Sequence, residues 1–435
     1  MRALALAAVL PLAMALGWAH GSQVASEERG DPSRLWAEEP RWVLLALRLS
    51  EWNTLPYVEP DRPCSFLVGQ ASSMDKVFRE AADFRGPFSS QVEIAAAGRE
   101  RESFQLVLLP VGEALRAVEV DISDLLHEDG RTRLPATCVT WHPVGYVQTK
   151  PSASAIRRVG WWWPDILLPA EPFDVELGFV QPVWFTVEVP DRARAGTYHG
   201  LIKLNPAGIE PRVVGLELTV RSFSLPLRGK LKTAFSFNPG MWAMWYHPEE
   251  VKRHLGMGDE AEWGTVHELN SSWECAHLMP GEKWREVYGF LLAHRLNPTT
   301  IYAHLEDGRA WVVPGREDME YCYERGMNAT CLAHVEARFV PSDPEEAAEY
   351  LRTLDAWLAD WQSFIEEKGW QDFTWYVHGF DESDWRQDPE TTTDPWIRRI
   401  YGGIGATFPQ IKRESANPLN PLHIGLFDIW TPQTG

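Results

Sequence analysis

The chain has 435 residues, enough for two or three domains that each bury a core of their own. It carries 61 acidic residues against 41 basic ones, which gives a formal net charge of −20. A surface with this excess of negative charge repels phosphate groups, so we do not expect nucleic acid as a partner.

The N-terminus has the pattern of a secretory signal peptide. Arg2 is followed by an uncharged, mostly apolar stretch up to Trp18, and small and polar residues surround Gly21. The apolar stretch is short for a membrane-spanning helix, and no later stretch is long enough to cross a bilayer. We therefore expect a signal peptide over 1–21, an extension over 22–62, no stable membrane insertion, and a secreted or periplasmic protein. An uncleaved N-terminal anchor is the alternative.

The five cysteines are spread along the chain, and no two of them form a CxxC motif. Their odd number and wide spacing indicate neither a zinc site nor a disulfide framework. We expect no metal and no cofactor.

A β-sandwich domain is predicted over 63–226. Short apolar segments alternate there with turn residues, and Asp129–Gly130 and Ala207–Gly208 mark two of the turns. Strands at this spacing, with few helices between them, are typical of a sandwich. The clearest predicted strands are 103–110, 183–190, 197–204 and 213–220.

From residue 227 to 435, strand-like and helical segments alternate, which predicts a (β/α)8-type barrel. The clearest helix begins with Asp343 as N-cap and Pro344 at its first position, and it ends at Gly369. Other helices are predicted over 284–296 and 394–407, and strands over 231–237, 300–304, 329–334, 373–378 and 424–429.

This predicted barrel is shorter than the roughly 250 residues of a complete one, and only about six strands can be counted. The sequence therefore predicts a multidomain β plus α/β protein whose barrel is truncated after about six strands. An open barrel would leave unpaired strand edges, which favours aggregation and loss of activity.

The most informative segment is 375–385, where a strand-like run ends in Asp381 and Glu382 among aromatic residues. Chemistry in such barrels takes place at the carboxyl ends of the strands. Cleavage of a glycosidic bond needs one carboxylic acid to protonate the leaving oxygen and a second anionic group to stabilise charge at the sugar. The structural alternative is a carboxylate pair that caps a following helix. The 22 Trp residues offer surfaces on which sugar rings stack.

Other polar and aromatic residues follow the predicted strands, among them the carboxylates Glu306, Asp307 and Glu336. Residues near strand ends that could contact a substrate are Asn238, Trp242, Asn328, Tyr376, His378, Asp428 and Trp430.

The segments 99–107, 195–200, 326–328, 379–382 and 427–430 resemble glycoside hydrolase family 123, the retaining exo-β-N-acetylgalactosaminidases and related domains of unassigned function. The resemblance covers most of the chain from about residue 85 onward. It implies that Glu382 is the general acid/base and that Asp381 orients the substrate's own 2-acetamido group. The acetamido oxygen would then attack the anomeric carbon and give an oxazolinium intermediate. Adjacent carboxylates suit this mechanism, because they cannot easily straddle a sugar ring at the ~5 Å separation of ordinary retaining enzymes.

Three functions remain open from the sequence. The first is a hydrolase that releases terminal β-linked N-acetylgalactosamine from glycans. The second is a glycosidase of another specificity, in which Glu382 works with Glu306, Glu336 or Asp428. The third is a non-catalytic protein that binds carbohydrate.

Overall fold

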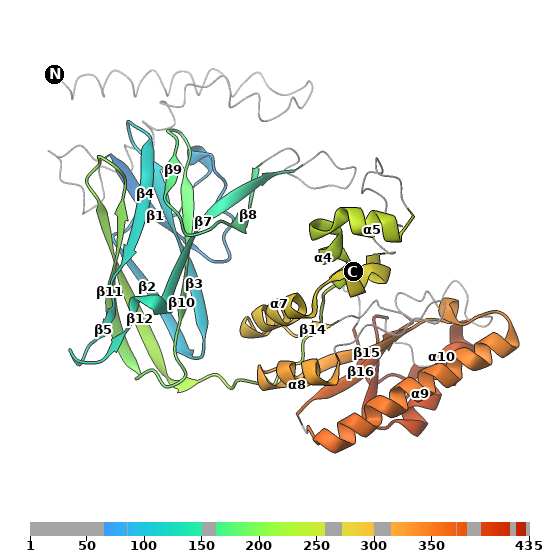
Figure 1. The fold of residues 1–435 in the computed structure, drawn as a ribbon. Helices are drawn as coiled ribbons and strands as arrows, with labels where there is room; N and C mark the ends of the chain where they lie inside the picture. Colours follow the sequence, from blue (N-terminus) through green and yellow to red (C-terminus); the bar gives the residue numbers. More distant parts are fainter. Residues whose placement is uncertain are drawn as a thin grey trace, which may run out of the picture. The chain divides into compact units, whose positions relative to one another are not determined.

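The computed structural model describes residues 65–431 except for 85, 150–161, 257–271, 300–314, 371, 381–392 and 418–422. The chain divides into two compact units, Met1–Leu225 and Pro226–Gly435 (Figure 1). No helix within these described ranges is long and apolar enough to span a membrane.

The first unit is the predicted β-sandwich. One sheet has the order β1-β3-β10-β7-β8 and the other the order β2-β12-β11-β4-β9, where β5 also pairs with β11 and β6 pairs with β5. Their bounds are β1 Phe66–Ser72, β2 Gln91–Gly98, β3 Arg101–Pro110, β4 Leu115–Ile122, β5 Leu125–His127, β6 Arg133–Leu134, β7 Val139–Gln148, β8 Trp162–Leu167, β9 Phe173–Val175, β10 Gln181–Glu188, β11 Gly196–Asn205 and β12 Arg212–Ser224.

The sandwich core explains why apolar and polar residues alternate along these strands. Leu106 and Phe185 from one sheet and Tyr198 and Leu218 from the other belong to a single buried cluster. Strand β3 is buried on both faces, because Val107 and Leu109 pack beneath the segment that contains Phe84. All four strands predicted most clearly correspond to observed strands, β3, β10, β11 and β12, although β10 ends two residues before the predicted end at 190.

The second unit alternates parallel strands with helices. Strands β13 and β14 form one parallel pair, and β15-β16-β17-β18 form a parallel sheet in chain order. The strand bounds are β13 Phe235–Ser236, β14 Pro298–Thr299, β15 Ala329–Val335, β16 Thr374–Gly379, β17 Ile411–Ser415 and β18 Ile429–Trp430. The helices are α4 Pro239–Tyr246, α5 Pro248–His254, α7 Gly281–Ala293, α8 Arg316–Glu324, α9 Pro344–Lys368 and α10 Thr393–Thr407, with 3-10 turns η3 Ser272–Leu278 and η4 Ala337–Phe339.

Hydrogen bonds link the two parallel sheets. The backbone N–H of Asn328 donates to the Asn297 side chain at 2.9 Å, and that of Cys331 donates to the Thr299 hydroxyl at 3.0 Å. These contacts place β14 and β15 side by side in the same direction, so the described strands share one carboxyl edge. The described residues show parallel β/α structure in two sheets and do not show the predicted barrel.

Several strand predictions need correction. The strands predicted over 231–237 and 424–429 are reduced to the two-residue strands β13 and β18. Strand β17 was not among the predicted segments, because its sequence holds Lys412, Arg413 and Glu414 and has no apolar run. The strand predicted over 300–304 lies outside the described residues.

Helix α9 begins and ends as predicted. The Asp343 carboxylate accepts hydrogen bonds from the N–H groups of Glu345 and Glu346, and Gly369 adopts the left-handed conformation that ends the helix. Helices α9 and α10 cover one face of the β15-β16-β17-β18 sheet, where Leu332, Val377 and Ile411 join a large apolar core (Figure 1).

The opposite face of this sheet carries a small cluster that includes Cys331 and Tyr376. The thiol of Cys322 lies in the large core. Burial raises the pKa of both thiols, Cys322 and Cys331, to about 12.

Candidate active site at the carboxyl edge of the parallel sheet

Three polar side chains lie on the face opposite α9 and α10, near the carboxyl ends of consecutive strands. His334 belongs to β15, His378 to β16 and Glu414 to β17, and all three are buried. The two imidazole rings lie 5.1 Å apart between centroids. Because His378 follows Tyr376 by two residues in a strand, it points to the same face as that residue. A convergent polar set at this edge is the arrangement in which barrel-type enzymes place their chemistry.

The Glu414 carboxylate connects three strands. One of its oxygens pairs with Nδ1 of His378, and the other accepts a hydrogen bond from the Thr431 hydroxyl at 2.6 Å. Beside this group, Nε2 of His334 lies 3.4 Å from a carboxylate oxygen of Glu336, which follows β15 and is 7% exposed. These contacts bring together buried polar groups from β15, β16 and β17 at one edge.

The path of the chain out of β16 is fixed by Gly379 and Phe380. A Cβ on Gly379 would lie 2.0 Å from the carbonyl oxygen of Val335, so only glycine fits beside β15. Phe380 has a φ of +52°, which is unusual for a residue with a side chain. Its ring is fully buried and lies edge-on to Tyr401.

Backbone hydrogen bonds hold Phe380 in this conformation. Its N–H donates to the Val335 carbonyl at 3.1 Å, and its own carbonyl accepts from the Ser415 hydroxyl at 3.2 Å and from the Asn417 amide. The strained residue immediately precedes Asp381, and backbone strain of this kind persists where the surroundings enforce it. Asp381 and Glu382 themselves lie outside the described residues, as do Glu306 and Asp307.

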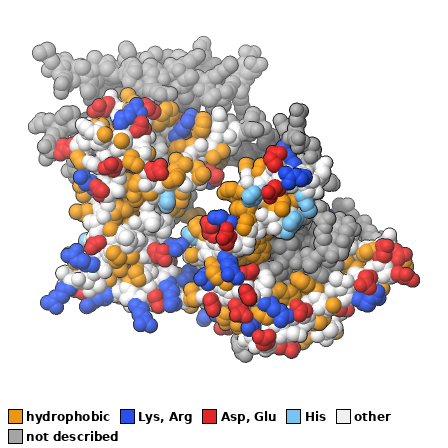
Figure 2. All heavy atoms as spheres, viewed as in Figure 1, with side chains coloured by type: hydrophobic (Ala, Val, Ile, Leu, Met, Phe, Trp, Pro, Cys, Tyr) orange, Lys and Arg blue, Asp and Glu red, His pale blue; other side chains and the backbone are white. Residues whose placement is uncertain are grey.

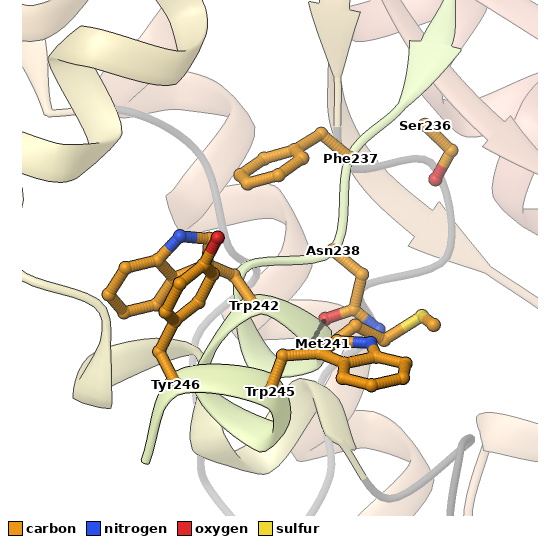
Figure 3. Close-up of a pocket in the computed structure, with 7 residues that line it drawn as sticks. All are labelled: Ser236, Phe237, Asn238, Met241, Trp242, Trp245 and Tyr246. Carbon is orange, nitrogen blue, oxygen red and sulfur yellow. Dashed lines mark hydrogen bonds between the residues drawn. The ribbon is translucent and has the colours of Figure 1, made fainter. Parts of the chain in front are cut away.

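A second group of predicted residues follows β13. The Asn238 side chain caps α4 by accepting from the N–H groups of Gly240 and Met241 at 2.9 and 3.2 Å. Trp242 stacks on Tyr246 with ring centroids 4.7 Å apart. With the neighbouring side chains they line an open pocket of about 590 Å³ (Figure 3). The lining residues are Ser236, Phe237, Asn238, Met241, Trp242, Trp245 and Tyr246.

Asp428 and Trp430 lie toward the helix-covered side of the sheet. Burial opposes ionisation of Asp428, but hydrogen bonds from the side chain and backbone of Arg413 outweigh it and lower the pKa of this carboxyl. The ring of Trp430 packs against Phe427 in the large core. The structure does not bring Asp428 and Trp430 to the polar face.

Tyr376 lies on the same face of the sheet as His378. Burial raises the pKa of the Tyr376 phenol far above its usual range, so this group stays neutral.

Comparison with known proteins identifies the sandwich. Residues 73–206 match the family model of the glycoside hydrolase 123 N-terminal domain. The predicted resemblance to glycoside hydrolase family 123 is confirmed. The segments 99–107 and 195–200, on which the resemblance was partly based, both lie inside the matched range.

Comparison with solved structures shows that the similarity extends to the three-dimensional fold. A family 123 glycoside hydrolase from Clostridium perfringens, described in a study of glycolipid glycan hydrolysis, matches 84% of this chain and 67% of its own, with a TM-score of 0.53 and 12% identity. At this identity the match shows a shared fold. A FixG-related protein from Vibrio parahaemolyticus matches 37% of this chain and 99% of its own at 10% identity, but its TM-score of 0.19 supports no inference. No match was found among curated proteins.

Sequence reasoning missed part of the site in this family 123 relative. It did not select Glu414, His334 or Asn417, which lie with His378 at the carboxyl edge. His334 had a signal, because it is a polar residue in a predicted strand whose other residues are apolar or small. Glu414 and Asn417 lie in and just after β17, which was not recognised as a strand. The described residues contain no group of three or more His, Cys, Asp or Glu side chains arranged to hold a metal ion.

Asn328 lies at the opposite, amino edge of the sheet. Its side-chain amide donates to the carbonyls of Gly229 and Leu231 at 2.6 and 2.9 Å, and its side-chain oxygen accepts from Asn297 at 2.8 Å. The residue is 2% exposed. These bonds give Asn328 a structural role that ties the start of β15 to the chain before β13.

We expect Asn328→Ala to lower the free energy of unfolding by about 1–3 kcal/mol, because it removes three side-chain hydrogen bonds and leaves the buried Asn297 amide with one acceptor fewer. Urea denaturation measures the loss, and KM should stay unchanged. Asn297→Ala should cost a similar amount, and the double variant should cost less than the two losses together, because the residues share a hydrogen bond. A raised KM with unchanged stability would instead place Asn328 at the substrate.

Proposed function

We propose that this chain is a secreted or periplasmic retaining glycoside hydrolase that releases terminal β-linked N-acetylgalactosamine from glycans. In this proposal Glu382 is the general acid/base, and Asp381 orients the acetamido group of the substrate, which acts as the nucleophile. The relationship to glycoside hydrolase family 123 supports a glycosidase.

The observation that carries the proposal is the convergence of His334, His378 and Glu414 at the edge where the chain enters Asp381. A carboxylic acid that must stay protonated before it donates requires surroundings with little water, and a second anion close by helps it to retain the proton. The buried network supplies such surroundings directly beside residue 380. Adjacent carboxylates cannot easily lie on opposite sides of a sugar ring, so the substrate itself would supply the nucleophile.

A second candidate mechanism uses a conventional pair of carboxylates. Glu336 and Glu414 are buried at the same edge, and either could act with Glu382 on a sugar that lacks the acetamido group. Asp428 is a weaker partner, because Arg413 already holds both of its carboxylate oxygens.

Turnover of a panel of chromogenic glycosides by the full chain tests these alternatives. We expect hydrolysis of the β-N-acetylgalactosaminide and little or none of the matched β-galactoside, which differs only at the 2-position. Preferred hydrolysis of the β-galactoside would replace the proposal with the two-carboxylate mechanism. Binding of N-acetylgalactosamine-terminated glycan without any turnover would indicate a carbohydrate-binding protein.

A further inference from the structure

We infer that the aromatic pocket after β13 is a glycan-binding subsite that holds the part of the substrate beyond the terminal sugar. The inference rests on the proposed function and adds a site for the leaving-group side of the glycan. Its central residues are Trp242, Trp245 and Tyr246 of α4.

Two of these aromatic side chains and the neighbouring Met241 are exposed. Trp245 is 81% exposed, Tyr246 is 68% exposed and Met241 is 38% exposed. Figure 2 shows that the neighbouring α5 instead carries mainly charged and histidine side chains at its surface. A cluster of exposed apolar side chains on one short helix is typical of a binding surface.

One side of the pocket is packed against buried residues, and the other side is exposed. Trp242 packs on the small cluster of Ala243, Met244, Val251 and Cys275, and its ring supports that of Tyr246. In Figure 3, Trp242 and Tyr246 lie together on one side of Asn238, and Trp245 lies beside Met241 on the other. The rings therefore form two aromatic surfaces around a polar centre.

The lining favours an uncharged, amphipathic ligand. None of the seven lining residues carries a charge, although the chain as a whole is strongly acidic. Indole and phenol rings stack on the C–H faces of sugars, while their N–H and O–H groups remain available to hydroxyls. The volume of about 590 Å³ lies within the range of small-molecule sites. Neutral sugar residues satisfy all of these features.

The place of the pocket in the strand order indicates that it binds the leaving-group side of the glycan. The terminal sugar must lie at Asp381 and Glu382, which follow β16, whereas the pocket follows β13. Strands β14 and β15 lie between them, and the linking hydrogen bonds described above align these strands at one edge. A substrate of more than one sugar would extend along this edge from β16 toward β13.

The test is Trp245→Ala in the full chain, with Phe290→Ala as the matched control, because Phe290 is also an exposed aromatic residue (64%) but does not line the pocket. We expect Trp245→Ala to lower kcat/KM about tenfold for a tetrasaccharide that ends in β-linked N-acetylgalactosamine. The same variant should leave kcat/KM for methyl β-N-acetylgalactosaminide unchanged within about twofold, since a methyl group cannot reach the pocket. Phe290→Ala should change neither value.

Calorimetric binding of the tetrasaccharide to Glu382→Gln separates this inference from the proposed function. Adding Trp245→Ala should raise Kd about tenfold. Binding that depends on Trp245 in a chain that hydrolyses nothing would support the subsite and refute the hydrolase. Hydrolysis of the tetrasaccharide that is unaffected by Trp245→Ala, or affected equally for the methyl glycoside, would refute the subsite and leave the hydrolase standing. Absence of tetrasaccharide binding would also refute the subsite.

Discussion

Glu382→Gln should slow the hydrolysis of a natural glycan far more than that of an activated phenyl glycoside. The glutamine cannot protonate the leaving oxygen, and a sugar leaving group needs that proton whereas a nitrophenolate departs without it. The difference between the two substrates should be ~10²–10⁴-fold, the usual contribution of a general acid. Asp381→Asn should slow both substrates to a similar degree, because the lost interaction acts on attack by the acetamido oxygen. Parallel measurement of kcat/KM for both substrates tests the assignment.

A thiazoline that mimics the oxazolinium intermediate provides the control for these two variants. It should bind the parent enzyme and lose affinity in Asp381→Asn. If the thiazoline does not bind and a 2-fluoro sugar instead traps a covalent adduct on Glu336, Glu414 or Glu306, substrate assistance is wrong. The conventional two-carboxylate mechanism would then take its place.

Gly379→Ala should abolish most of the activity, because the added methyl group would lie 2.0 Å from the carbonyl oxygen of Val335. A backbone atom cannot move aside as a side chain can, so β15 and β16 must separate at the carboxyl edge. We expect a destabilisation of about 1–3 kcal/mol and a loss of at least about tenfold in kcat at temperatures where the variant stays folded. Urea denaturation and steady-state kinetics measure the two effects.

Gly403→Ala is the matched control for Gly379→Ala. Gly403 lies in α10, and a Cβ there would meet no other atom within 4 Å. This substitution should keep full activity and stabilise the helix by up to about 1 kcal/mol. Asn417→Ala removes the amide that donates to the Phe380 carbonyl and to the Ser415 hydroxyl without adding a clash between strands, so it should lower kcat with a smaller loss of stability. Full activity in both Gly379→Ala and Asn417→Ala would show that the Phe380 conformation does not position the residues after it.

The sequence was sufficient to predict an element when the residues that begin it, end it and set its apolar period all lie within one segment. Helix α9 has an N-cap at Asp343, a left-handed glycine at Gly369 and an apolar face between them, and all three act within one segment. The sandwich strands were predictable for a similar reason, because their alternating residues face a core that covers each sheet.

The candidate site was harder to predict, because its contacts join residues far apart in sequence. The pair of His378 and Glu414 depends on β16 lying beside β17, which the sequence of a single strand does not specify. Asn328 illustrates the converse problem. It has the polar, strand-adjacent character of a site residue, yet it precedes β15, and its amide is fully used by backbone carbonyls at the amino edge. The direction of a parallel strand, not proximity to it, decides which edge a flanking residue reaches.

Two of the buried thiols in the second unit, Cys322 and Cys331, can report local opening of that unit. Cys322 and Cys331 are 1% exposed, and with a pKa of about 12 each remains protonated at neutral pH. A protonated, inaccessible thiol reacts with neither alkylating agents nor peroxide, because the thiolate is the reactive species. Modification of either cysteine therefore requires transient unfolding around α8 or β15. The rate of alkylation in native buffer would measure how often the second unit opens, without any denaturant.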